Sequence, residues 1–231
     1  MKRLFAIMLT VALLMTGTAL ATGYHKDALT FDYDKKAFSI TMDDHTDTED
    51  LVILTAKDKT FGDAYVRIHL RSMDAGETAP TVADFKDMPE EVTQGEWNGF
   101  EDVIMYTVDD DAFTESYYIV PVALGDNASA LLTVRIGVDK LDDEEASMKR
   151  DDMISAVMDT LIVGAAVQAT GSVHIRKGPG LDYEELGAVQ KGATLKYLGA
   201  TETDARGVDW YKVEYDGAEA WVSSKYSGIM E

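Results

Sequence analysis

Histidines and carboxylates are the side chains of this chain that could bind a metal ion or transfer protons. The sequence has four histidines, and no two of them lie within helical reach of each other: His25, His45, His69 and His174. No His-Glu-x-x-His or similar zinc pattern occurs, which speaks against a zinc peptidase or amidase. The spacing of the histidines therefore predicts no metal centre.

The carboxylates gather in three clusters, at 43–50, 109–111 and 142–145. Carboxylate oxygens are the ligands that calcium prefers, so each cluster could bind that ion outside the cell. None of the three has the Asp-x-Asp-x-Asp-Gly spacing that closes a loop around calcium. We interpret the clusters as solvated surface that keeps the protein soluble, and we predict no metal site and no cofactor.

Other catalytic signatures are missing from the sequence. It has no cysteine, which excludes disulfides, thiol catalysis and a peptidase of the NlpC type. It also lacks a Gly-x-Ser-x-Gly elbow, a P-loop and a dinucleotide fingerprint. With 42 Asp and Glu residues, no single carboxylate pair stands out as a glycosidase site. We therefore expect a protein that acts by binding and is not an enzyme.

Aromatic residues concentrate near the C-terminus, in the stretch WYKVEYDGAEAWVSSKY at 210–226. Successive side chains of a strand point to opposite faces, so Trp210 shares a face with Lys212 while Val213 points to the core. Trp221 likewise aligns with a charged neighbour in the next strand. Both tryptophans are therefore expected to face outward.

Two interpretations of these rings remain open. They could form an aromatic groove that binds an extended peptide, or they could cap the open ends of a small β-barrel. Arg176 could steer a carboxylate into such a groove or brace the Gly-Pro-Gly loop beside it. The candidate ligand-binding residues are Tyr183, Trp210, Tyr211, Trp221, Tyr226 and Arg176.

The first residues of the chain predict export. A basic start is followed by an apolar run and by small residues up to Ala21, the pattern of a secretory signal peptide over 1–21. Threonine and glycine interrupt the apolar run, so we expect cleavage and no stable membrane insertion. The net charge of −21 makes nucleic acid a poor partner. The protein is expected to be secreted, either outside the cell or in the cell envelope.

Residues 22–163 have the pattern of an acidic α+β domain. Asn98-Gly99 is a strong turn signal that leads into an apolar strand. Helices are predicted from Thr81 and from Ser147, each of which is placed to cap its helix, and the second helix ends before Gly164. Further strands are predicted at 51–56, 63–71, 113–124 and 130–138, after an opening hairpin with its turn at 34–36. This order of elements implies helices packed on an antiparallel sheet.

Three stretches of this region resemble a known family. They are FDYDKKAFSITM near its start, the WNGF turn in its middle and VMDTLIV at its end. All three are similar to the PsbP/DcrB-like domain of exported bacterial proteins. The resemblance covers about 28–163 and implies an α+β fold without a catalytic signature.

A second region follows a small, uncharged segment at 164–170, which could be a linker or the lead-in to a first strand. From residue 166 onward, 7 Lys and Arg stand against 10 Asp and Glu, so most of the negative charge belongs to the first region. Short strands bounded by Gly, Pro and Asp turns predict a small all-β barrel over 171–231. The chain is thus expected to have two domains.

The second region resembles the bacterial Src-homology-3 (SH3b) domain along its length. The resemblance rests on RKGPG at 176–180, GAVQKG at 187–192, WYKV at 210–213 and AWVSSKY at 220–226. It implies an SH3-like barrel that binds cell-wall (peptidoglycan) peptides or other extended polypeptides. One departure is His174, where the family more often has Asn.

These features predict a secreted, non-enzymatic binding protein whose SH3b domain recognises cell-wall peptides or another extended polypeptide. The alternative is a cell-wall hydrolase with a carboxylate site in the N-terminal domain, which the SH3b domain would tether to its substrate. The two predictions differ in whether cell walls are only bound or are also degraded.

Overall fold

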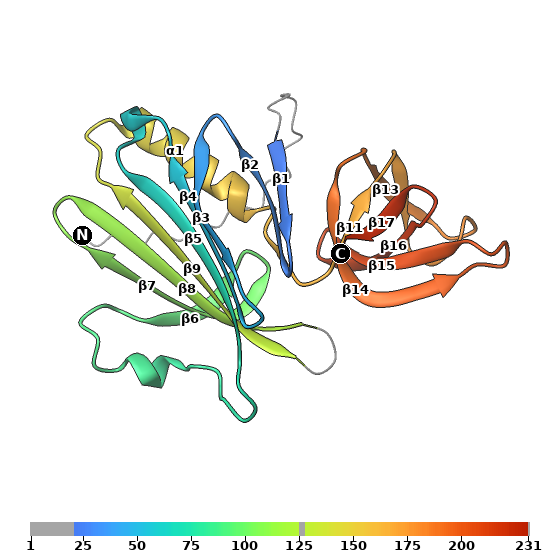
Figure 1. Cartoon of the computed structure of the whole chain (residues 1–231), viewed down its shortest axis with the longest axis horizontal. Coiled ribbons are helices and arrows are strands. Elements are labelled where there is room, and N and C mark those ends of the chain that lie inside the picture. The colour runs from blue at the N-terminus through green and yellow to red at the C-terminus, as the bar shows by residue number, and fades with distance from the viewer. Residues whose placement is uncertain (1–20, 125–127, 231) are drawn as a thin grey trace.

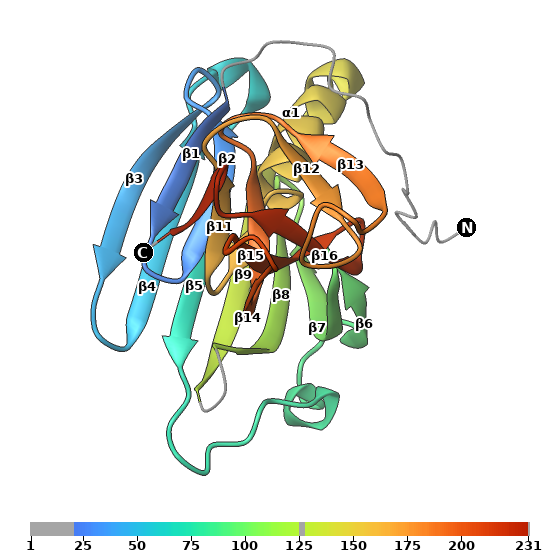
Figure 2. The ribbon, with the colours of Figure 1, turned by 90° about the vertical axis from the view of Figure 1, so that its right-hand side faces the viewer.

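The computed structural model describes residues 21–124 and 128–230, and it arranges them in three β-sheets. Figure 1 shows two parts side by side, and Figure 2 shows the C-terminal part in front of the large N-terminal sheet. The predicted signal peptide lies outside the described residues except for Ala21, where the first strand begins. Within the described ranges, no helix has the length and apolar character needed to cross a membrane.

The larger N-terminal sheet has seven antiparallel strands. In sheet order they are β3 (Phe38–His45), β4 (Glu49–Ala56), β5 (Ala64–Ser72), β9 (Ser129–Asp139), β8 (Phe113–Ala123), β7 (Phe100–Asp109) and β6 (Thr93–Trp97). Alternate residues of the central strands are buried, as in β5, where Val66 and Ile68 have no exposed surface. The strands that alternation predicted in this region are confirmed.

A smaller sheet consists of β1 (Ala21–Lys26), β2 (Leu29–Asp34) and β10 (Ile162–Val163). The helix α1 (Glu144–Met158) packs against β2 and contributes Ile154 and Val157 to the core. Leu29 and Phe31 of β2 belong to the same hydrophobic cluster. One core therefore holds both N-terminal sheets and the helix together.

The N-terminal part is mostly β, so the predicted α+β fold with packed helices is wrong. Among the described residues, α1 is the one α-helix. The other predicted helix is a short 3₁₀ turn, η2 (Val82–Phe85), because Pro80 and Pro89 stand on either side of the segment. A second 3₁₀ turn, η1 (Lys59–Phe61), joins β4 to β5. The same observation contradicts the α+β fold that the PsbP/DcrB-like resemblance implied.

The helix α1 begins earlier than predicted. Its N-cap is Asp143, whose side-chain oxygen accepts hydrogen bonds from the backbone N–H groups of Glu145 and Ala146, both at 3.0 Å. Ser147, the predicted cap, lies inside the first turns. Acidic residues in the first turn interact favourably with the positive end of the helix dipole, which is why the acidic run starts the helix here.

One predicted turn is confirmed and one predicted hairpin is wrong. Asn98 and Gly99 have φ values of 52° and 76°, the left-handed conformation of a tight hairpin turn, and they join β6 to β7. At the turn after Asp34 the flanking strands separate, since β2 pairs with β1 and β10 while β3 pairs with β4. The chain changes sheets at this turn.

The C-terminal sheet also has seven strands. Their order is β13 (Glu185–Val189), β12 (Val173–Arg176), β16 (Ala218–Ser223), β15 (Asp209–Tyr215), β14 (Thr194–Thr203), β11 (Ala166–Ala169) and β17 (Ser227–Met230). Its core contains Ile175, Val213 and Val222, none of which has exposed surface. Part of the segment 164–170 forms β11, which pairs with β14 and β17, so the segment leads into a first strand.

Candidate functional site

A groove of about 180 Å³ opens on the C-terminal sheet. Its walls come from β12, from the loop between β14 and β15, and from the turn between β16 and β17. Its lining residues are Val173, His174, Arg176, Leu181, Asp204, Arg206, Val208, Trp210, Ser223, Lys225 and Tyr226. Three of the six predicted ligand residues are therefore in this groove: Arg176, Trp210 and Tyr226.

The two tryptophans are buried, which corrects the prediction that they face outward. Trp210 is 2 % exposed and Trp221 is 8 % exposed, and they pack together with Val208 in a cluster of their own. They do lie on the face opposite Val213, which belongs to a separate cluster. The alternation was thus correct, but the outer face is covered. Trp210 lies in the groove wall, and Trp221 packs behind it.

The cover is the loop between β14 and β15. Its ends are joined by a backbone hydrogen bond from Asp204 to Val208 at 2.9 Å. The Asp204 carboxylate accepts hydrogen bonds from Arg206 at 2.7 Å and from Nε1 of Trp210 at 3.2 Å. These hydrogen bonds, the one from Arg206 foremost, hold the pKa of the Asp204 carboxyl well below its usual range. The loop therefore fixes the indole ring in one orientation.

Exposed apolar side chains form the rims of the groove. Leu181 and Tyr226 line it, and both are 54 % exposed. Tyr183 is also exposed, but its ring lies beside the groove, against the Gly178-Pro179-Gly180 loop. Exposed apolar surface beside a pocket is a common mark of a binding site. The groove thus combines a buried aromatic side chain, Trp210, with exposed apolar side chains.

Arg176 braces the loop that carries Tyr183. Its guanidinium donates a hydrogen bond to the backbone oxygen of Tyr183 at 2.8 Å and lies 3.6 Å from the Glu185 carboxylate. The side chain is only 15 % exposed. The bracing interpretation therefore has direct support, and the same side chain also forms part of the groove wall.

Tyr211 is on the core side of its strand. It packs against the cluster that contains Val213, and its ring meets Tyr197 edge to face at 6.2 Å. Like Trp221, Tyr211 is not among the residues that line the groove. Tyr183, Tyr211 and Trp221 are therefore the predicted contacts that lie outside the groove lining.

The groove is locally basic in an acidic protein. Arg176, Arg206 and Lys225 line it against a single carboxylate, Asp204. Sequence reasoning missed Leu181, Asp204, Arg206 and Lys225. Two of these, Arg206 and Lys225, are basic residues in a chain with a net charge of −21. Their positive charge in an acidic sequence is the signal that could have identified them. The arrangement can bind an extended chain with apolar side chains and a carboxylate.

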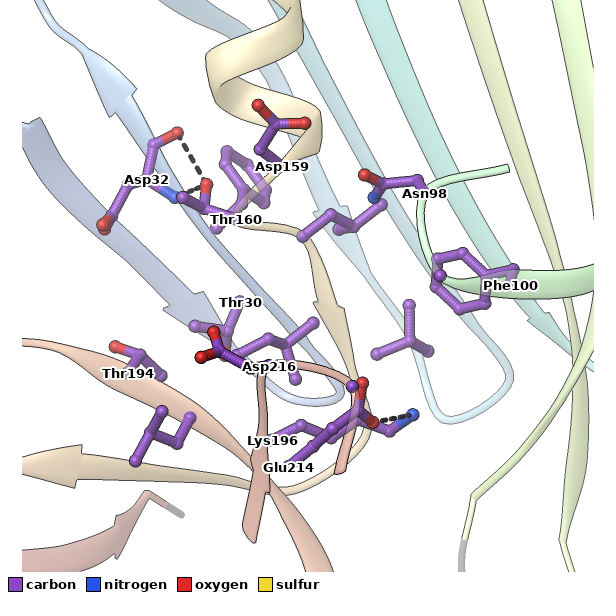
Figure 3. Close-up of a pocket in the computed structure, with 17 residues that line it drawn as sticks. Thr30, Asp32, Asn98, Phe100, Asp159, Thr160, Thr194, Lys196, Glu214 and Asp216 are labelled. Carbon is purple, nitrogen blue, oxygen red and sulfur yellow. Dashed lines mark hydrogen bonds and ion pairs between the residues drawn. The ribbon is translucent and has the colours of Figure 1, made fainter. Parts of the chain in front are cut away.

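A second pocket lies where the C-terminal sheet meets the N-terminal part (Figure 3). It has a volume of about 290 Å³, with walls from β2, the end of α1, the β6–β7 turn, β14 and the turn after β15. The side-chain amide of Asn98 donates a hydrogen bond to the Met158 carbonyl at 2.6 Å. Thr160 accepts one from the backbone N–H of Asp32 at 2.8 Å. These bonds attach the turn and the helix end to the pocket wall.

This second pocket, which we call the interdomain cleft, is acidic. Burial raises the pKa of Asp32, and partial loss of water around Asp159 raises the pKa of that carboxyl. Lys196 is the one basic residue of the lining that the structure describes, and it pairs with Glu214 at 3.4 Å. Such a cleft repels a carboxylate. The groove is therefore the better candidate site for a peptide.

The segment that contains the groove matches a known family. Residues 170–227 match the family model of the bacterial SH3 domain, which confirms the resemblance of the C-terminal region. None of the curated proteins matches the chain. Among solved structures, the antimicrobial peptidase lysostaphin from Staphylococcus simulans is 12 % identical, with 74 % of this chain and 87 % of that chain covered at a TM-score of 0.24. So low a TM-score does not indicate that the two proteins share a fold.

Proposed function

We propose that this protein is a secreted, non-enzymatic binding protein whose bacterial SH3 domain binds extended peptides of the cell wall. The observation that carries the proposal is the groove, with the Trp210 wall, the apolar rims and the basic lining together on the matched segment. Export rests on the predicted signal peptide at 1–21. The N-terminal part would present this domain or bind a partner of its own.

The groove suits a short stretch of peptide. A volume of about 180 Å³ is below that of a typical small-molecule pocket, so a few small side chains of a longer ligand would fill it. Trp210 and Tyr226 offer flat apolar surface to such a chain. Lys225 favours a carboxylate on the peptide, whereas Arg206 is already paired with Asp204.

Sedimentation of chain 22–231 with purified bacterial cell walls tests the groove. Leu181→Ala and Tyr226→Ala each remove an exposed rim side chain, so folding is little affected. We expect each to weaken binding by about tenfold, or roughly 1.4 kcal/mol. Ile229→Ala is the matched control, since Ile229 is also exposed but lies on β17 outside the groove. If all three variants and the unmodified chain sediment equally with the cell walls, this groove is not the site of wall binding.

The same preparations separate binding from hydrolysis. A binding protein leaves the turbidity of a cell-wall suspension unchanged, whereas a hydrolase clears it. We expect no clearing by chain 22–231 over hours. Clearing by chain 22–231 would overturn the non-enzymatic proposal, and slower clearing by Tyr226→Ala would then favour a hydrolase tethered by the SH3 domain.

A further inference from the structure

A second cluster of titratable side chains lies outside the groove, where the small N-terminal sheet meets the edge of the large one. His45 ends β3, and its cross-strand partner on β4 is Asp50. Asp27 comes from the turn between β1 and β2. Asp43 and Tyr24 complete the cluster from β3 and β1. Three strands and one turn therefore supply its members.

The imidazole of His45 is at the centre of the cluster, and its side chain is only 6 % exposed. Its Nδ1 lies 2.7 Å from a carboxylate oxygen of Asp50 and 3.2 Å from one of Asp27. Its Nε2 lies 2.7 Å from a carboxylate oxygen of Asp43 and 2.8 Å from the Tyr24 hydroxyl. Both nitrogens thus face carboxylates.

A neutral His45 ring has too few N–H donors for the acceptors around it. An ionised carboxylate only accepts hydrogen bonds, and a neutral imidazole has one N–H. The Tyr24 hydroxyl donates to Asp43, so the same carboxylate is the acceptor for the N–H on Nε2 of His45. The Nδ1 lone pair is then directed at the acceptor oxygens of Asp27 and Asp50. A buried acceptor without a donor is costly, and either a second proton on Nδ1 or a cation between these three atoms removes the cost.

We propose that Nδ1 of His45 and the carboxylates of Asp27 and Asp50 bind a divalent transition-metal cation of the zinc type. The three ligand atoms all lie within 4.8 Å of one another. Ligands around a tetrahedral zinc ion are about 3.3 Å apart, so the distance to Asp27 already fits and that to Asp50 has to lengthen slightly. This inference is independent of the proposed function of the SH3 domain.

The surroundings suit such an ion. Asp43 accepts the N–H on the far side of the ring, which is the carboxylate–histidine–metal arrangement that orients a histidine ligand. Imidazole with two carboxylates favours zinc-like ions over calcium, which takes six to eight oxygen ligands. Asp27 is 60 % exposed at its side chain, so a water molecule can complete the coordination. The ion would attach the β1–β2 turn to the edge strand β3.

Isothermal titration of metal-free chain 22–231 with zinc chloride tests the site. We expect one zinc ion per chain and a higher unfolding temperature in its presence, because an ion that binds only the folded state stabilises it. Asp27→Asn removes one ligand but keeps a residue that tolerates the φ of 49° at this turn. It should weaken zinc binding by at least about tenfold and leave the unfolding temperature without zinc nearly unchanged.

The matched control is Asp102→Asn. Asp102 is also an exposed aspartate with positive φ, at 57°, and it lies on β7, away from the cluster. Its substitution should leave zinc binding unchanged. Equal zinc affinity in Asp27→Asn and the unmodified chain would overturn the site. Absence of zinc binding by the unmodified chain would overturn it as well and would indicate that a proton on Nδ1 of His45 donates to Asp27 and Asp50 instead.

Discussion

Trp210 and Trp221 lie on the face of their strands opposite Val213 and Val222, as alternation requires, and both are nevertheless buried. A strand pattern tells which residues share a face. It does not tell whether a loop covers that face, and here the loop at 204–208 does. At the scale of the residue, the faces were predictable and the burial was not.

The position of the Tyr183 ring depends on Gly178, which leaves room for the ring because it has no side chain. A Cβ on Gly178 would lie 2.3 Å from the Tyr183 ring, whereas one on Gly180 would lie 3.4 Å from it. Gly178→Ala should therefore displace the ring and cost about 1–3 kcal/mol of unfolding free energy, as overpacking does. Gly180→Ala should cost clearly less. Urea unfolding of both variants checks this, and equal losses would mean that ring contact with Gly178 is unimportant.

The helix α1 shows how a single cap decides where an element begins. Both Asp143 and Ser147 are residues that favour the N-cap position, and the sequence alone favoured the second. The structure places the cap at Asp143 because the acidic residues after it suit the start of a helix. The prediction of the helix was right, and its first turn was assigned to the wrong residues.

Removal of the cap tests this correction at the scale of the element. Asp143→Ala should lower the unfolding free energy by about 1 kcal/mol, because two backbone N–H groups lose their acceptor. Ser147→Ala should be neutral or slightly stabilising, since Ser147 lies in the helix, where alanine is preferred. Urea unfolding monitored by circular dichroism compares the two. A larger loss of unfolding free energy from Ser147→Ala than from Asp143→Ala would instead identify Ser147 as the N-cap.

The whole molecule has a basic groove on the SH3 domain and an acidic cleft where that domain meets the rest. The groove lining contains Arg176, Arg206 and Lys225, while the cleft contains Asp32 and Asp159. This division suits a peptide carboxylate at the groove and keeps it out of the cleft. Only the folded chain brings these charges from distant segments onto separate surfaces.

The cleft carboxylate Asp32 gives the molecule a specific dependence on pH. Burial raises the pKa of Asp32, so its charged form destabilises the folded state at neutral pH and its protonated form does not. Asp32→Asn should therefore stabilise the chain at pH 7 by about 0.5 kcal/mol after allowance for solvent screening. The gain should shrink as the pH falls through the raised pKa toward pH 3.

Urea unfolding at several pH values measures this effect. Asp152→Asn, on an exposed position of α1, changes the net charge by the same amount outside the cleft and serves as the control. A gain from Asp32→Asn that stays constant between pH 7 and pH 3, or that equals the gain from Asp152→Asn, would show that burial in the cleft does not govern Asp32.

Features that depend on neighbouring residues could be predicted from the sequence alone. These are the SH3 domain with its glycine and tryptophan motifs, the Asn98-Gly99 turn and the long strands. Each rests on backbone preferences or side-chain alternation over a few residues, which act without the rest of the chain. That is why these predictions survived.

Contacts between distant segments became known only from the folded chain. Folding made the N-terminal part mostly β, covered Trp210 with a loop, and brought Asp27 from a different strand pair to His45 and Asp50. Spacing along the chain does not bring Asp27 next to His45, because the two residues belong to segments that pack together only after folding. Burial and coordination depend on contacts between distant residues, and no local pattern contains those contacts.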